Sequence, residues 1–288
     1  MKVSIATAYL PPEELVPIAK AADELGYHGM ALADHVLNLE ELTTEYPYTD
    51  DGNRRWDPFT PWVDPMVAIG ALGAVTEHLR FFTNIYVLPM RNPFPVAKAV
   101  ATASAFTGGR VSLGIGMGWC GEEFDQLEAR FRKRGARADE MIEVLRRLWT
   151  GEWVEHHGEF YDFPRLEMTP APAGDVPIYV GGLSEAALKR AARNDGWISD
   201  LISTDQAAEF RVAIDRHREE LGKTGDFSMI VSLNDAITLD QFRRAEDVGV
   251  TDLLTMPWAY HGGFDQDLQG KIDGMKRFWD EVAGPIGA

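Results

Sequence analysis

Short runs of apolar residues alternate with amphipathic segments along the whole chain. The runs are mostly continuous instead of alternating between apolar and polar residues, which is typical of strands covered on both faces. Each run is followed by a segment with helical spacing of its apolar residues, the first of which ends at Gly26. We predict strands at residues 2–8, 29–34, 80–88, 110–116, 177–182, 196–200, 227–234 and 252–258.

Eight successive strand–helix units in 288 residues predict an α/β fold of the (β/α)8 TIM-barrel type. A doubly wound sheet is the alternative, but it typically has fewer units and often adds a second domain with a visible change in composition. The sequence contains no such change. We therefore expect one domain over residues 1–288.

Two segments interrupt this repeat. Residues 37–63 follow the second predicted strand and carry Trp56, Phe59 and Trp62 among polar residues and prolines. Because barrel active sites form at the C-terminal ends of strands, we predict that this segment is a lid or a wall of the substrate site. A solvated excursion is the alternative. Residues 151–176 precede the fifth strand on its N-terminal side, and we expect them to be structural.

Composition and charge narrow the class of protein. The chain is 45% hydrophobic and 25% charged, as in an ordinary globular protein, and no run of about 18 apolar residues predicts a membrane span. A net charge of −17 argues against nucleic acid and anionic membranes as partners. Cys120 is the single cysteine, and the first residues suggest a strand and not a signal peptide, so we expect a cytoplasmic protein without an internal disulfide.

Asp34 and His35 end the second predicted strand, where side chains of a barrel face a bound ligand. Histidine transfers protons near neutral pH and can donate a hydrogen bond to an anionic ring. We predict that this pair is catalytic, and a turn aspartate beside a packed histidine is the alternative. The sequence has no H-E-x-x-H, no paired cysteines and no G-x-S-x-G, so a metal site and serine hydrolysis have no local support.

Two other strand ends carry features that suit a ligand. Gly181 and Gly182 allow close approach of the backbone, and Ser184 is placed to cap the next helix, whose first N–H groups would bind phosphate. A plain glycine turn with a helix cap is the alternative. Asn84 lies in an otherwise apolar strand, so either the strand is irregular there or a ligand supplies its hydrogen bond.

Residues 116–121 spell G-x-G-x-x-G, the written form of a dinucleotide-binding turn. In a Rossmann domain this turn belongs to the first βα unit, and an acidic residue ends the next strand about 20 positions later. Here three units precede the turn, and Asp139 and Glu140 lie inside a predicted helix. The context therefore argues against a dinucleotide site.

Several stretches in order over residues 30–200 together resemble the luciferase-like monooxygenase superfamily, in its coenzyme F420-dependent oxidoreductase branch. They are LADH, TNIYVLPMRNPFPVAK, GGRVSLGIGMGWCGEEFDQL, FRKRGARADEMIEVLRRLWTG, HHGEFYDF and PIYVGGLSEAALKRAARNDGWI. The G-x-G-x-G-W run followed by R-G-x-R-x-D-E is the most specific of these motifs. The resemblance implies a bacterial luciferase-like barrel, with insertions after strand 2 and before strand 5.

The resemblance also implies a flavin or deazaflavin across the C-terminal mouth of the barrel. One strand end would carry a non-prolyl cis peptide behind the central ring, a glycine-rich loop would run beside the ring, and a glycine turn would bind phosphate. Asp34 and His35 match an acidic–histidine pair near the redox ring. The implied cofactor-binding residues are Thr83, Asn84, Ile85, Gly116, Met117, Gly118, Trp119, Gly181, Gly182, Leu183 and Ser184.

The implied activity is hydride transfer between coenzyme F420 and a small organic substrate. The alternatives are an FMN-dependent monooxygenase that uses reduced flavin and oxygen, and a non-catalytic flavin- or deazaflavin-binding protein. In the sugar-phosphate dehydrogenases of this family a catalytic glutamate follows the last glycine of the loop. Trp119 holds that position and Glu122 is displaced by three residues, so a sugar phosphate is not the expected substrate. Dimers are common in the superfamily, so a homodimer is an expectation here.

Overall fold

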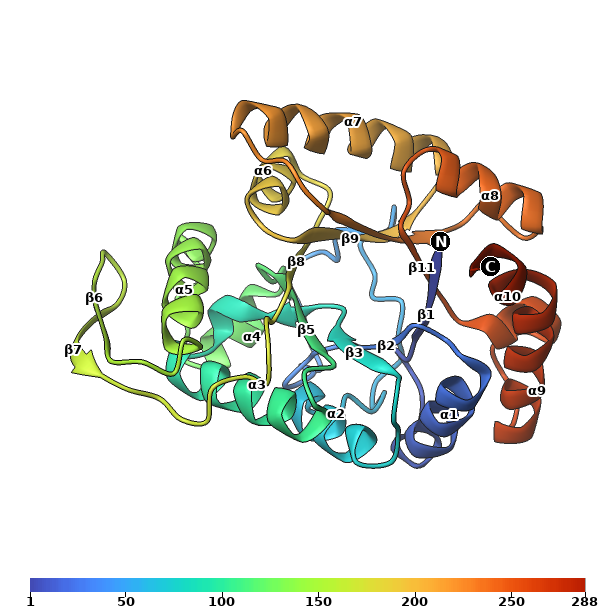
Figure 1. Ribbon diagram of the computed structural model, residues 1–288, viewed down its shortest axis with the longest axis horizontal. Helices are drawn as coiled ribbons and strands as arrows, with labels where there is room; N and C mark the ends of the chain where they lie inside the picture. Colours follow the sequence, from blue (N-terminus) through green and yellow to red (C-terminus); the bar gives the residue numbers. More distant parts are fainter. Residues whose placement is uncertain (288) are drawn as a thin grey trace.

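A computed structural model describes residues 1–287 and shows a ring of parallel strands surrounded by helices (Figure 1). The strands of the ring are β1 (Lys2–Ala6), β2 (Gly29–Leu32), β3 (Arg80–Thr83), β5 (Val111–Gly116), β8 (Ile178–Gly181), β9 (Gly196–Ile202), β10 (Ser228–Leu233) and β11 (Asp252–Thr255). Their order is β3-β2-β1-β11-β10-β9-β8-β5, and β3 also pairs with β5, which closes the ring. The predicted (β/α)8 barrel is confirmed.

Helices cover the outside of the barrel, and side-chain caps fix where several of them begin. Asp64 accepts hydrogen bonds from the N–H groups of Met66 and Val67, and Ser203 and Thr238 form capping boxes. The helices that follow the strands in turn are α1 (Pro12–Leu25), α2 (Pro65–Gly73), α3 (Pro93–Thr107), α5 (Arg134–Leu148), α6 (Glu185–Arg193), α7 (Thr204–Glu220), α8 (Leu239–Asp247) and α9 (Leu268–Phe278). A π-helical turn (Trp279–Ala283) and α10 (Gly284–Gly287) follow α9.

The core has two parts, because alternate residues of a barrel strand point toward the helices or toward the barrel axis. Ile5, Met30 and Leu113 belong to the large cluster between strands and helices. A separate buried cluster joins residues of five different strands and therefore fills the barrel axis: Ala31, Phe82, Ile198, Ile230 and Leu254. None of the helices within residues 1–287 has both the length and the apolarity needed to cross a membrane.

The third predicted strand is interrupted. After β3 the Asn84–Ile85 peptide bond is cis, and the strand resumes as β4 (Tyr86–Val87), which pairs with β5 before a 3-10 turn at Leu88–Met90. The side chain of Ile85 lies over Gly116, where a Cβ atom would come within 1.9 Å of Ile85 Cδ1. Any larger residue at position 116 would displace Ile85. The irregular strand that Asn84 suggested is present.

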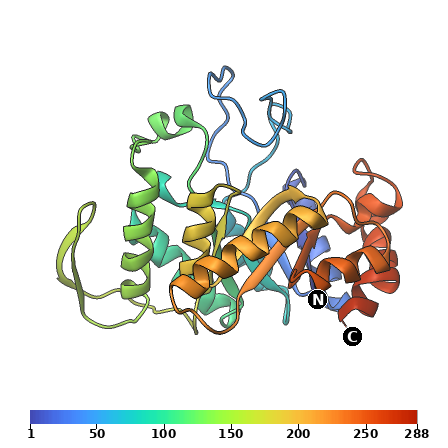
Figure 2. The same ribbon diagram turned by 90° about the horizontal axis from the view of Figure 1, so that it is seen from above.

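The two insertions differ in structure. Residues 33–64 cross the rim of the barrel without a helix or strand, and Figure 2 shows them projecting at the top beside α4 (Gly121–Gln126). Residues 151–176 contain an antiparallel hairpin, β6 (Val154–His157) and β7 (Asp162–Leu166), which lies beyond α5 at the left of Figure 1. We predicted both insertions but not the hairpin. We predicted a single domain over residues 1–288. Residue 288 lies outside the described residues, and the extent of the domain stays a prediction.

Candidate active site

The C-terminal ends of the strands form one rim, because all strands of the barrel are parallel. The residues predicted from sequence lie at the ends of four of these strands. Asp34 and His35 follow β2, Thr83 to Ile85 follow or end β3, Gly116 to Trp119 end and follow β5, and Gly181 to Ser184 end and follow β8. The fold thus brings these four segments to the same end of the barrel.

His35 is held on this rim by one hydrogen bond and by aromatic packing. Its Nδ1 lies 3.2 Å from Oε2 of Glu123, and its side chain is 14% exposed. Its ring packs against Trp56 and Trp62 at centroid distances of 4.9 and 5.1 Å, with Trp119 at 6.4 Å. Within residues 1–287 no hydrogen-bond partner meets its Nε2. One ring nitrogen is therefore held by the protein and the other is available.

Glu123, in the first turn of α4, is the residue that holds His35. Its side chain is 3% exposed, and its Oε1 accepts hydrogen bonds from the N–H groups of Val36 at 2.8 Å and Leu37 at 3.4 Å. Burial alone would raise the pKa of Glu123, but the hydrogen bonds from His35 and from these two N–H groups lower it below its usual value. Glu123 is therefore a carboxylate that accepts from Nδ1–H of His35.

Asp34 occupies a different environment from its neighbour. Its carboxylate forms two hydrogen bonds of 2.7 Å with the guanidinium of Arg91 and accepts a third, at 2.9 Å, from the N–H of Val87. Burial raises the pKa of Asp34, and Arg91 opposes this increase. Asp34 thus ties the end of β2 to Val87 of β4 and to Arg91, and its direct participation in catalysis stays a prediction.

The insertion at residues 37–63 contacts the rim at three places. Glu122 of α4 accepts hydrogen bonds from the backbone and hydroxyl groups of Thr43 and Thr44. Arg55 forms a bidentate ion pair with Asp200 at the end of β9, with both N–O distances 2.8 Å. Aromatic rings from the insertion and the rim pack together above His35: Tyr9, Tyr46, Trp56, Trp62 and Trp119.

One donor in this aromatic group has no acceptor. The Nε1–H of Trp62 is buried, and no hydrogen-bond partner reaches it within residues 1–287. Trp62 also lines a cavity of about 10 Å³ at the ends of β1 and β2, together with Thr7, Tyr9 and Leu32. A buried N–H without an acceptor is costly, so this donor suits a bound group with an oxygen or nitrogen acceptor.

The turn after β8 leads into the N-terminus of α6. Gly182 has φ +115°, a conformation that favours glycine, and its carbonyl accepts a hydrogen bond of 2.8 Å from Trp197 Nε1. Ser184 caps α6 by accepting from the N–H of Ala187. The remaining N–H groups of the first helical turn have no acceptors inside the helix and carry the positive end of its dipole.

The glycines of β5 and of the loop after it make room for neighbouring elements. A Cβ at position 114 would lie 1.9 Å from the carbonyl oxygen of Thr83, and one at position 118 would lie 2.6 Å from both Phe124 and Val87. Gly118 also has φ +75°. These glycines allow β3, β4 and α4 to approach β5, which places Trp119 and Glu123 near His35.

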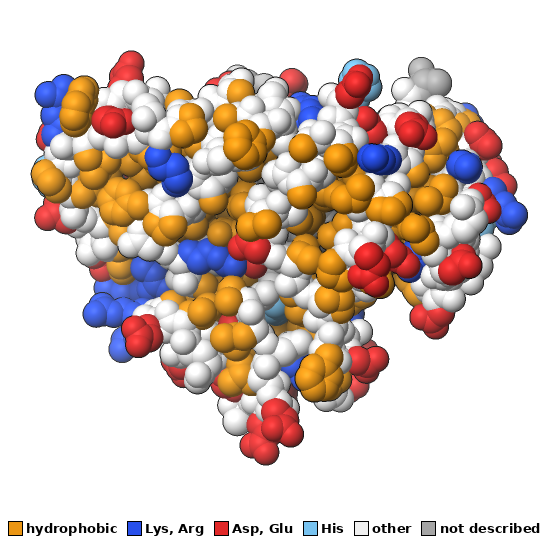
Figure 3. All heavy atoms as spheres, turned by 90° about the horizontal axis from the view of Figure 1, so that it is seen from below, with side chains coloured by type: hydrophobic (Ala, Val, Ile, Leu, Met, Phe, Trp, Pro, Cys, Tyr) orange, Lys and Arg blue, Asp and Glu red, His pale blue; other side chains and the backbone are white. Residues whose placement is uncertain are grey.

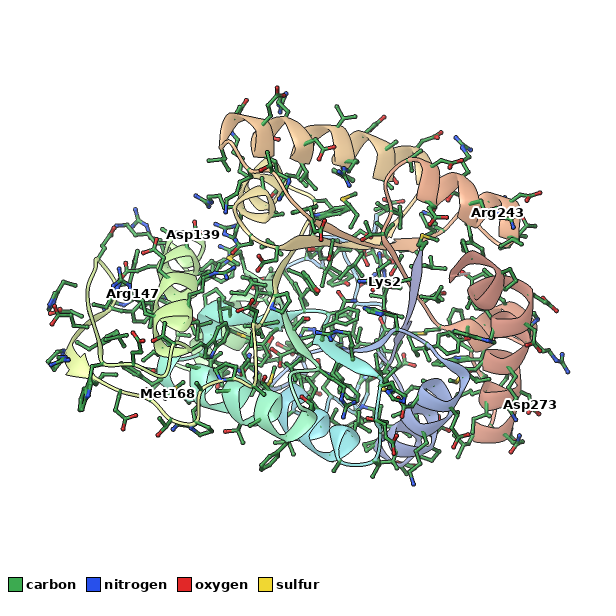
Figure 4. All side chains as sticks on the ribbon, in the orientation of Figure 1. Lys2, Asp139, Arg147, Met168, Arg243 and Asp273 are labelled. Atoms are coloured by element: carbon green, nitrogen blue, oxygen red, sulfur yellow. The ribbon has the colours of Figure 1, made fainter. Side chains whose placement is uncertain are left out.

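A second histidine–glutamate pair lies outside the barrel, between α5 and the β6–β7 hairpin. His156 Nε2 is 3.2 Å from Oε1 of Glu140, whose carboxylate also accepts hydrogen bonds from the N–H groups of Glu159, Phe160 and Tyr161. A groove of about 620 Å³ runs along this contact. Figure 4 labels two of its lining residues on α5, Asp139 and Arg147. The groove is remote from the rim that carries the predicted site.

Sequence reasoning did not identify Glu123 or Arg91. The signal for Glu123 was its place in an acidic pair that opens the segment after the glycine loop, but only the fold shows which of the two glutamates faces His35. Arg91 lies 57 residues from Asp34 in sequence, and no local pattern joins them. Both are long-range contacts that depend on how β2, β4 and β5 pair.

Comparison with known proteins places the chain in a protein family. The profile of the luciferase-like monooxygenase family matches residues 3–248, and the chain belongs to this family. An uncharacterized protein of Mycobacterium tuberculosis is 40% identical over 289 residues, which cover 99% of this chain and 100% of that protein. An F420-dependent glucose-6-phosphate dehydrogenase of Nakamurella multipartita is 31% identical over 284 residues, or 94% of this chain and 76% of that protein.

Two solved structures share the fold. The monooxygenase RslO1 from Streptomyces bottropensis superposes with a TM-score of 0.79 at 20% identity, covering 100% of both chains. The coenzyme F420-dependent tetrahydromethanopterin reductase from Methanopyrus kandleri gives a TM-score of 0.77 at 14% identity, covering 99% of both chains. At these identities the likeness concerns the barrel and not the reaction.

Proposed function

We propose that this protein is an F420-dependent oxidoreductase that transfers a hydride between the deazaflavin and a small organic substrate. The observation that carries the proposal is His35, which stands on the rim of a luciferase-like barrel with Nδ1 bound to Glu123 and Nε2 available. Relatives named as F420-dependent dehydrogenases support the choice of cofactor.

The residues on the rim fit such a cofactor. The N-terminus of α6 after Gly182 would hold its phosphate, Trp62 Nε1 would donate to an acceptor on the bound group, and the Asn84–Ile85 segment would lie behind the ring. When bound, the deazaflavin supplies a hydride acceptor in its oxidised form and a hydride donor in its reduced form. The remaining requirement is a group that moves a proton.

His35 Nε2 would meet that requirement. When a hydroxyl carbon loses a hydride to the cofactor, the hydroxyl oxygen must lose a proton, and Nε2 of neutral His35 would accept it. In the reverse direction the carbonyl carbon would receive the hydride, and Nε2 would return the proton to the oxygen. Glu123 stabilises the imidazolium in either direction because it remains a carboxylate.

We propose that residues 37–63 form a wall of the substrate site and that the substrate carries no phosphate. Two arginines near the rim are already paired, Arg55 with Asp200 and Arg91 with Asp34. Trp119, not a glutamate, follows the last glycine of the loop. These features favour an uncharged substrate over a sugar phosphate.

We also propose a cytoplasmic homodimer that uses the face of α2 and α3. Figure 3 shows hydrophobic side chains spread over the side of the molecule where these helices lie, and Val67 and Phe106 are 73% and 71% exposed. A Phe106→Glu variant should shift the sedimentation coefficient to that of a monomer. Val212→Glu, at a residue 71% exposed on α7, should leave the sedimentation coefficient unchanged.

Titration with coenzyme F420 and with FMN, followed by fluorescence, tests the cofactor. We expect F420 to bind and to be reduced by a suitable alcohol in the absence of oxygen. Binding of FMN alone, with product formation that requires oxygen, would instead support a monooxygenase. Tight F420 binding without turnover of any of a panel of alcohols and carbonyl compounds would support a binding protein.

A further inference from the structure

We propose that Glu123 is the positioning residue of this site: it fixes the proton of neutral His35 on Nδ1 and so leaves Nε2 unprotonated at the rim. The proposal deepens the proposed function, because an unprotonated Nε2 is what proton acceptance from substrate requires. The hydrogen-bond geometry itself belongs to the protein without cofactor and can be tested there.

The hydrogen-bond geometry constrains Glu123 to act as an acceptor. Its Oε1 is occupied by the N–H of Val36 at 2.8 Å, and its Oε2 is 3.2 Å from Nδ1 of His35. A backbone N–H can only donate, so Oε1 must accept. Two backbone N–H groups, of Val36 and Leu37, donate to this carboxyl group and favour its ionised form. A carboxylate has no proton to donate, so Oε2 accepts as well, and the proton of the pair lies on Nδ1.

The other groups around His35 do not compete with this arrangement. The neighbouring carboxylate, Asp34, is occupied by Arg91 and the N–H of Val87. The other side chains packed against the ring are the indoles of Trp56, Trp62 and Trp119, and an indole donates only through Nε1. Glu122, one residue away, is occupied by Thr43 and Thr44. Glu123 is thus the carboxylate that controls the His35 tautomer.

Replacing Glu123 with glutamine gives a specific expectation. The fixed N–H of Val36 requires an oxygen, so the amide oxygen takes the position of Oε1 and the NH2 group faces Nδ1. That NH2 group can only donate, so Nδ1 becomes the acceptor and the proton moves to Nε2. The Glu123→Gln variant should therefore hold His35 in the opposite tautomer without losing the contact.

The experiment uses protein labelled with 15N-histidine, without cofactor, at a pH where His35 is neutral. Long-range 1H–15N spectra distinguish the two tautomers, and the His35 signals are assigned by their loss in His35→Gln. We expect Nδ1–H in the wild-type protein and in Glu122→Gln, and Nε2–H in Glu123→Gln. An Nε2–H tautomer in the wild-type protein overturns the proposal regardless of how the variants fold.

Kinetics then connect the tautomer to the reaction. With F420 and a substrate alcohol, Glu123→Gln should lower kcat by about 10²-fold or more with a small change in KM, as seen when an amide replaces the carboxylate of a Ser-His-Asp triad. Asp125→Asn, at an exposed residue of the same helix, should stay close to wild type. A switched tautomer with unchanged kcat would remove Glu123 from the mechanism. An Nδ1–H tautomer in a wild-type protein that does not bind F420 would refute the proposed function and leave the hydrogen-bond assignment intact.

Discussion

Each of the two insertions of this barrel is held by a glutamate that also contacts a histidine, but the two histidine–glutamate pairs lie in different parts of the molecule. In each, one glutamate on a helix, buried in the case of Glu123 and half-buried in the case of Glu140, accepts backbone N–H groups next to or within the insertion. Each glutamate also contacts a histidine: Glu123 with His35, and Glu140 with His156. Only the first pair lies at the C-terminal ends of the strands. A histidine–glutamate contact is therefore no evidence of catalysis by itself, and its place in the barrel decides its use.

The largest expected difference between the two histidine–glutamate pairs is their effect on the rate of hydride transfer. His35→Gln should lower the rate of hydride transfer by about 10²–10⁴-fold, the usual contribution of a proton-transferring side chain. His156→Gln should leave that rate within about twofold of wild type, because the proposed reaction needs no proton there. The measurement is single-turnover reduction of F420. Equal losses in both variants would show that the pairs act through stability alone.

The second prediction concerns stability at the hairpin. Glu140→Gln replaces a carboxylate that accepts three backbone N–H groups by an amide with a single acceptor oxygen. We expect a loss of about 1.5–3 kcal/mol in the free energy of unfolding, measured in urea with an unchanged m-value. Glu155→Gln, at an exposed residue of β6, is the matched control and should change the free energy of unfolding by less than about 0.5 kcal/mol.

The contacts that Glu123 and Glu140 make should both weaken in acid. Burial raises the pKa of Glu123 and of Glu140, but hydrogen bonds outweigh it and leave both lowered in the folded protein. The stability they provide is present above the unfolded value of about 4.3 and is lost as the pH falls through the folded value. The destabilisation caused by Glu140→Gln should therefore be smaller at about pH 3 than at about pH 7. A destabilisation independent of pH would contradict this account.

The smallest effects should come from the surface ion pairs. Arg55 and Asp200 are 32% and 27% exposed, whereas Lys133 and Glu159, which join α5 and the hairpin turn, are 62% and 63% exposed. Arg55→Met should cost at most about 1 kcal/mol, and Lys133→Met still less. Hydrogen exchange should speed up in residues 37–63 only for Arg55→Met. Faster hydrogen exchange in both insertions of either variant would show that neither ion pair stabilises its own insertion alone.

The barrel was predictable because its evidence is local. Each apolar strand and each amphipathic helix is encoded within about 15 residues, and eight repeats of that unit leave few alternative folds. Asp34 and His35 followed from the same pattern, since strand ends could be located to within a few positions, whereas most of the other rim residues came from the resemblance to a known family. Asn84 also followed from the pattern, because one polar residue in an apolar strand suggested either an irregular strand or a bound ligand, and the strand is irregular after Thr83.

The contacts between rim residues were not predictable from one sequence. Glu123 and Glu122 are adjacent and chemically alike, but the direction of α4 aims one at His35 and the other at Thr43. Sequence reasoning assigned Gly116 and Gly118 to the cofactor, which stays a prediction. It did not foresee that Gly116 also makes room for Ile85, and Gly118 for Phe124 and Val87. Such packing depends on strand register, which the periodicity of the chain does not specify.

The attachment of residues 37–63 to the ends of the strands has a consequence for how this protein could diversify. The barrel supplies His35, Glu123 and the turn before α6, while a single continuous surface segment supplies Trp56 and Trp62. Since long surface segments tolerate exchange better than strands do, a replacement of this segment could change the molecules admitted while the proton-transfer pair remains in place. New specificity would then require one recombination event and not a rebuilt core.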